Sequence, residues 1–193
     1  MENTFIPALT ICGIHELPSQ QTRGVTHVLS LLDPDWPTIE AFQRYDEHHR
    51  ETLCFHDVID PAEGKLPPTP ALVEEILRFG AGLEASRADR KEGHLLVHCH
   101  MGVSRSTAAM LALLAQAFPR ASEDRLFEHL RQIRPQAWPN SLMIEYADDL
   151  LGRGGRLMTA LCEHYGHQLK RDPGFRDWMT QLGRGREVEM AVT

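Results

Sequence analysis

The fold is decided by the stretch LLVHCHMGVSRS, residues 95–106, followed by TAAMLALL, residues 107–114. The apolar run at 95–97 predicts a short buried strand, the residues after it a tight loop, and the last segment a helix that is apolar nearly all round. In an open α/β sheet, clefts form where such a loop follows the carboxyl end of a central strand. We therefore predict an α/β fold with a central, mostly parallel sheet flanked by helices, in which this loop joins a central strand to a buried helix.

The loop has the chemistry of an oxyanion site. It ends at a helix N-terminus, where unpaired backbone N–H groups and the positive end of the helix dipole favour an anion. The same field stabilises the thiolate of Cys99, which makes this residue a candidate nucleophile. Arg105 carries a planar guanidinium that matches two phosphate oxygens at once. The sequence thus predicts a phosphate-binding loop with Cys99 at its start.

These residues resemble a known signature. His98, Cys99, Arg105 and Ser106 stand at the spacing His-Cys-x5-Arg-Ser/Thr of the cysteine-dependent protein tyrosine phosphatase superfamily. Gly102 and the serines around Arg105 look most like its small dual-specificity branch of bacterial type. The resemblance covers about residues 5–152 and implies a phosphomonoester hydrolase that works through a cysteinyl-phosphate.

The resemblance also implies a role for each residue of the loop. Cys99 attacks phosphorus, Ser106 stabilises the departing thiolate, and His98 organises the loop while its charge favours the thiolate. The residues that bind the substrate phosphate are His100, Met101, Gly102, Val103, Ser104 and Arg105. Neither a metal nor another cofactor is expected. Consecutive side chains His98, Cys99 and His100 cannot all face one zinc ion.

A proton donor is needed for a poor leaving group. Asp57 stands at the end of a predicted strand at 52–57, in which Leu53 and Phe55 share one face. The family places its general acid on a loop after such a strand. Asp60 lies in the same loop and is the rival candidate. We take Asp57 as the general acid and leave Asp60 open.

Asn140 follows the pair Arg134-Pro135 and precedes a predicted helix at 141–151. Two interpretations of this residue stay open. In the first it steadies the phosphate loop by hydrogen bonding, as the superfamily implies, and in the second it caps the helix.

The rest of the chain sets the frame. We expect an edge strand at 5–12, a short helix at 16–23, a buried strand at 26–32, a structural turn at 33–37 and a polar helix at 38–50. A helix begins near Pro70, and Gly80 and Gly82 weaken its continuation. The predicted catalytic domain is 1–152, a helical extension at 153–182 packs on it, and 183–193 form a flexible tail.

Composition limits the partners. A net charge of −7 over 193 residues argues against a general nucleic-acid or anionic-membrane binder. Four cysteines without paired spacing, and no targeting segment or long apolar run, indicate a cytoplasmic protein. We expect a monomer or weak dimer.

The substrate class follows from what the loop lacks. Superfamily members that act on phosphoinositides tend to carry lysines there, and this loop has none, which favours a phosphotyrosine-containing protein. Phosphoinositides and small phosphoesters stay open as substrates. A phosphate-binding pseudophosphatase, or a sulfur-transfer or arsenate-reducing enzyme, would also use a cysteine in an anion-holding loop.

Overall fold

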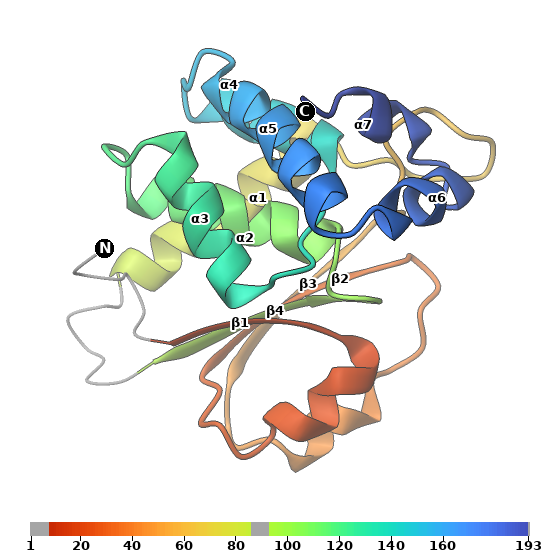
Figure 1. Ribbon diagram of the computed structural model, residues 1–193. Coiled ribbons are helices and arrows are strands. Elements are labelled where there is room, and N and C mark those ends of the chain that lie inside the picture. Colours follow the sequence, from red (N-terminus) through yellow and green to blue (C-terminus); the bar gives the residue numbers. More distant parts are fainter. Residues whose placement is uncertain (1–7, 86–92, 193) are drawn as a thin grey trace.

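The computed structural model describes residues 8–85 and 93–192. Within these ranges a four-stranded sheet crosses the molecule (Figure 1). Its strands are β1 (Ala8–Gly13), β2 (His27–Leu32), β3 (His49–Cys54) and β4 (His94–Cys99), in the order β1-β4-β2-β3 and all parallel. The predicted fold class is confirmed. Residues 5–7 of the predicted first strand lie outside the described residues.

β4 is an inner strand. It pairs with β1, where Gly13 stands opposite Cys99, and on its other side with β2. All six of its residues are buried, as a strand covered on both faces requires. The carboxyl end of β4, which carries Cys99, therefore lies between the ends of its two neighbours.

Helices cover both faces of the sheet unequally. One face carries the α-helices, and the two 3-10 helices lie on the opposite face (Figure 1). The α-helices are α1 (Pro70–Ala85), α2 (Arg105–Ala117), α3 (Glu123–Ile133), α4 (Ser141–Leu150), α5 (Arg156–Arg171), α6 (Gly174–Gln181) and α7 (Gly185–Glu189); the 3-10 helices are η1 (Ile14–Gln20) and η2 (Glu40–Arg44).

The helical extension shares the core of the catalytic part. Residues 105–115 of α2 are all buried, as the apolar composition of residues 108–115 predicts. Trp138 stacks on Tyr165 of α5 with ring centroids 4.3 Å apart, and Phe175 and Met179 of α6 are buried in the same core. The chain after residue 152 thus packs on α3, on α4 and on Trp138 between them.

The predicted helix at 38–50 is wrong in its second half. Of this range only residues 40–44 are helical, as the 3-10 helix η2, and β3 already begins at His49 and ends at Cys54. β3 is an edge strand, so His49 and Arg50 stay exposed while their backbone pairs with β2. A polar edge strand lacks the apolar alternation that reveals a strand in sequence. The expected helix at 16–23 is the 3-10 helix η1.

Two glycines do not weaken α1. The helix continues through Gly80 and Gly82 to Ala85. A Cβ at Gly80 would lie 2.2 Å from Oε1 of Gln116 on α2. Gly80 therefore allows the two helices to approach closely, and this packing offsets its low helix propensity.

The prediction of a flexible tail from residue 183 is wrong up to residue 192. Residues 185–189 form α7, and the side chains of Arg184, Glu187 and Val188 are buried. Two of these residues are charged, so the sequence predicts that they are exposed to solvent. Their burial depends on partners far away in the chain.

None of the helices within the described ranges has the length and apolar character that crossing a bilayer requires.

Candidate active site

The predicted nucleophile lies at the bottom of the loop. Cys99 ends β4 and is 2% exposed, and its Sγ is 3.2 Å from Oγ of Ser106. Ser106 is buried in the first turn of α2. A thiolate at this position has a hydroxyl donor beside it and the N-terminal end of a buried helix in front of it.

The loop approaches β1 so closely that only glycine fits at one position. Gly102 has φ +69°, and a Cβ on it would lie 2.4 Å from the carbonyl carbon of Cys12. The backbone N–H of Ile14 donates to the carbonyl of His100 at 3.0 Å. The loop is thus seated on the end of β1.

The carbonyls of the loop are held from outside. Besides the His100 carbonyl, two more accept from Arg134. The Met101 carbonyl lies 3.1 Å from Nη2 and the Gly102 carbonyl 2.9 Å from Nε. The Val103 carbonyl accepts from the backbone N–H of Trp138 at 2.9 Å. In a trans peptide the N–H points opposite to the C=O. The N–H groups of residues 101–104 therefore point away from these partners, toward the inside of the loop.

Arg105 is placed before any ligand binds. It is 2% exposed, and its Nη1 donates to Oδ1 of Asp33 at 2.7 Å and to the carbonyl of Phe55 at 2.5 Å. Its Nε is buried and has no partner within the described part of the chain. This donor suits an oxyanion held in the loop.

The turn at 33–37, which we expected to be only structural, contributes to the site. Asp33 lines the same pocket as Cys99. Trp36 lies against the ring of His100, with centroids 3.9 Å apart. Burial and the charge of Arg105 lower the pKa of His100.

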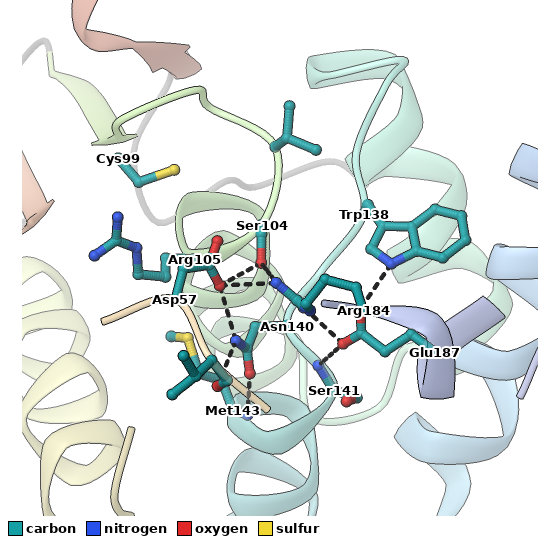
Figure 2. A network of polar contacts seen from close by, with 12 residues as sticks. Asp57, Cys99, Ser104, Arg105, Trp138, Asn140, Ser141, Met143, Arg184 and Glu187 are labelled. Carbon is teal, nitrogen blue, oxygen red and sulfur yellow. Dashed lines mark hydrogen bonds and ion pairs between the residues drawn. The ribbon is translucent and has the colours of Figure 1, made fainter. Parts of the chain in front are cut away.

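Asp57 faces the pocket, and Asp60 does not line it. Oδ1 of Asp57 accepts hydrogen bonds from Ser104 Oγ at 2.7 Å and Asn140 Nδ2 at 2.9 Å (Figure 2). Asp60 is 54% exposed and pairs with Arg186 at 2.9 Å. The side chain of Ser104 thus binds the carboxylate, whereas the sequence predicts that this residue binds the substrate phosphate.

Asn140 combines the N-cap with a second contact. Its Oδ1 accepts from the backbone N–H of Met143 at 3.1 Å, which caps α4. Its Nδ2 reaches Asp57 and, at 3.2 Å, the carbonyl of Val58. The polar contact beyond the cap therefore steadies the loop that carries Asp57 rather than the phosphate loop.

His98 supports the site without charge. It is fully buried, and its Nε2 lies 2.7 Å from Oγ of Ser30. Burial lowers the pKa of His98 to about 4. The expectation that its charge favours the thiolate is therefore wrong, because the imidazole is neutral near pH 7.

One cavity of about 280 Å³ is lined by Cys99, Arg105, Asp57, Asp33 and His100. Its floor is the phosphate loop, and Met101 at its rim is 51% exposed. The C-terminal part of the chain supplies a further wall with the side chains of Trp178, Met179, Leu182 and Arg184. This wall cannot be predicted from the sequence, since an amphipathic pattern does not tell which surface a helix covers.

A second missed group is Arg134. Its Nη2 pairs with Oε2 of Glu16 at 2.7 Å, and Oε2 also accepts from the backbone N–H of Gly13. The Arg-Pro pair was noticed in sequence, but its function as a clamp on the loop needs the contact across 118 positions.

Comparison with known proteins bears on the fold. No protein-family model matches the chain. The human protein phosphatase Slingshot homolog 3 is 33% identical over 126 residues, which are 64% of this chain and 16% of that protein. The chain thus spans about one sixth of the length of this relative.

Solved structures resemble the chain over most of its length. Human DUSP28 has a TM-score of 0.55 at 22% identity and covers 78% of this chain and 98% of its own. The human tyrosine phosphatase-like serine/threonine/tyrosine-interacting protein has a TM-score of 0.56 at 18% identity, with 78% and 95% covered. The bacterial type of the branch stays a prediction. The chain has the fold of the dual-specificity branch of the cysteine-based tyrosine phosphatases.

Proposed function

We propose that the protein is a phosphomonoester hydrolase that acts through a cysteinyl-phosphate and prefers phosphotyrosine. One observation carries the proposal: the buried sulfur of Cys99 shares a cavity with the guanidinium of Arg105 and the carboxyl group of Asp57. A nucleophile, an anion clamp and a proton donor are the groups that this chemistry needs.

The first step transfers the phosphoryl group to sulfur. The Cys99 thiolate attacks phosphorus, so that an S–P bond forms while the ester P–O bond breaks. Arg105 and the loop N–H groups bind the three non-bridging oxygens. Asp57 gives its proton to the departing oxygen and becomes a carboxylate.

The second step returns the enzyme to its starting state. Water attacks phosphorus, its proton goes to the Asp57 carboxylate, and the S–P bond breaks to release inorganic phosphate. The departing sulfur leaves as a thiolate, and the Ser106 hydroxyl at 3.2 Å donates a hydrogen bond to it.

The wall from α6 supports an aryl substrate. Trp178, Met179 and Leu182 offer apolar surface beside the phosphate loop, where the ring of a phosphotyrosine would lie. A short phosphoserine side chain cannot both reach the loop and cover this surface. The cytoplasmic setting and the monomeric or weakly dimeric state stay predictions.

The test is hydrolysis of p-nitrophenyl phosphate in the presence of EDTA. We expect turnover by the wild type and by Cys54→Ser, because Cys54 is exposed and does not line the pocket, and none by Cys99→Ser. Turnover by Cys99→Ser would overturn the proposal. Phosphate binding without turnover by the wild type would indicate a pseudophosphatase.

Substrate choice and the proton donor are tested next. We expect phosphotyrosine peptides to be hydrolysed faster than phosphoserine peptides and phosphoinositides. Asp57→Asn should lower kcat on phenyl phosphate by about 100-fold or more, and by less on p-nitrophenyl phosphate, whose leaving group needs less protonation. Asp60→Asn serves as the matched control and should leave both rates unchanged.

A further inference from the structure

Arg184 reaches the site from the C-terminal part of the chain. It precedes α7 directly, and its side chain is 4% exposed. Its Nη1 donates to Oδ1 of Asp57 at 2.9 Å and to Oγ of Ser104 at 2.8 Å, across 127 and 80 positions (Figure 2). A buried guanidinium thus touches the residue to which we assign proton transfer.

The other end of this guanidinium is fixed as well. Its Nη2 donates to Oε1 of Glu187 at 2.7 Å, and Glu187 is fully buried. Glu187 in turn accepts from the indole N–H of Trp138 and from the backbone N–H of Ser141, both at 2.7 Å. With its buried charge paired and hydrogen-bonded on every side, Glu187 holds Arg184 in one place.

The contacts of Asp57 are all on one oxygen. Oδ1 accepts from Ser104, Asn140 and Arg184. Within the described part of the chain no hydrogen bond goes to Oδ2, and the carboxyl group, 29% exposed, faces the cavity. The network thus orients Asp57 and leaves its second oxygen open to a leaving group.

We propose that Arg184 is a positioning residue that aims Oδ2 of Asp57 at the leaving group, so that α7 belongs to the catalytic machinery. The proposal rests on the phosphatase function stated above. The carbonyls of the phosphate loop are held by Arg134 and by the backbone N–H groups of Ile14 and Trp138, none of which belongs to α7.

The charges around Asp57 agree with this role. Burial alone raises the pKa of Asp57, but the guanidinium groups of Arg184 and Arg105 bring it below its usual value. His100, Lys65 and Cys99 face the same cavity. The negative charge of a bound phosphate dianion raises the pKa of Asp57, against the effect of the two guanidinium groups. Substrate binding therefore favours the protonated acid that the first step needs.

The test removes the pair without leaving a buried charge alone. In the double variant Arg184→Met/Glu187→Gln we compare phenyl phosphate with p-nitrophenyl phosphate. We expect kcat on phenyl phosphate to fall at least about 10-fold further than on p-nitrophenyl phosphate, because only the poor leaving group depends on an aligned acid. The matched control, Arg156→Met, removes an exposed arginine that pairs with Glu123 and does not line the cavity, and it should change neither rate.

The pH profile separates positioning from general stability. Without Arg184 the pKa of Asp57 rises, so the decline of kcat/KM at high pH should move upward by roughly one unit or more. Arg184→Lys keeps the charge and should return this high-pH limb of the kcat/KM profile toward its wild-type position. A merely structural residue would leave the limb unmoved.

The outcomes distinguish the two proposals. Equal losses on both substrates with an unmoved limb, or no loss, would overturn the role of Arg184 and leave the phosphatase function intact. A wild type that hydrolyses neither substrate would overturn both. If circular dichroism shows the double variant unfolded, Arg184→Lys decides alone: a loss confined to phenyl phosphate supports the role, and equal losses or none refute it.

Discussion

Nη2 of Arg134 lies 2.7 Å from Oε2 of Glu16, although the two residues are 118 positions apart. This ion pair is formed behind the phosphate loop. Arg134 also binds the carbonyls of Met101 and Gly102, and Glu16 binds the N–H of Gly13 at the end of β1. The loop is thus shaped by residues that never meet the ligand.

Replacement of Arg134 should disturb both stability and catalysis. Arg134→Met removes charged donors from two loop carbonyls, which should lower the free energy of unfolding by about 2 kcal/mol. A loop that no longer keeps its N–H groups converged should also lower kcat/KM by about 10-fold or more. Urea unfolding and p-nitrophenyl phosphate kinetics measure the two effects. Arg156→Met, at a residue 59% exposed, is the control, and an equal effect there would contradict the clamp.

The loop should not tolerate a methyl group at Gly102. Gly102→Ala combines a positive φ with a contact of 2.4 Å to the backbone of Cys12. Gly152→Ala has the same kind of φ, +61°, and nothing within 4 Å of the new carbon, so it isolates the backbone strain. We expect Gly152→Ala to cost about 1 kcal/mol and keep activity, and Gly102→Ala to cost about 2 kcal/mol more and abolish it. Similar unfolding energies for the two variants would refute the tight seat on β1.

His98 should make the protein sensitive to mild acid. Its pKa is about 4 in the folded protein because it is buried, whereas an exposed histidine has about 6.5. Between these values the unfolded chain binds a proton that the folded protein does not, so stability falls as pH drops from about 6.5 toward 4.

His98→Gln keeps a hydrogen-bonding group for Ser30 and removes the titrating ring. The fall in unfolding free energy between pH 7 and pH 5 should be smaller in this variant than in the wild type, as urea denaturation at both pH values would measure. His164, whose pKa burial also lowers to about 4, contributes a further part of the fall in both proteins. His15→Gln, at an exposed position, should show the full fall. An undiminished fall in His98→Gln would refute the buried neutral ring.

The elements that carry strong apolar patterns were predictable from sequence. β4 and α2 are buried on all sides, so their composition alone identified them and the loop between them. β3 was shifted because its first residues are polar and exposed, and the pairing of an edge strand with its neighbour leaves no trace in its own side chains. η2 and the first two residues of β3 were therefore mistaken for one polar helix, and the end of β3 was predicted as part of a strand at 52–57.

The polar network around Asp57 was predictable only in part. Asp57 and Asn140 stand near recognisable motifs, so both were found. Arg184 and Glu187 lie in a stretch of glycines and charges, which favours solvation unless each charge meets a distant partner. Such pairings cannot be recognised from the properties of single residues, and residues 183–193 were therefore predicted to be a flexible tail.

The guanidinium group of Arg105 is held on one side by hydrogen bonds to Asp33 and to the carbonyl of Phe55 before any substrate binds. Its rotamer is therefore already frozen, and an incoming tetrahedral anion meets a donor that has little orientational entropy left to lose. Affinity for phosphate and for its analogues should on this account depend on how firmly the turn at 33–37 keeps its shape, as much as on the residues that touch the anion.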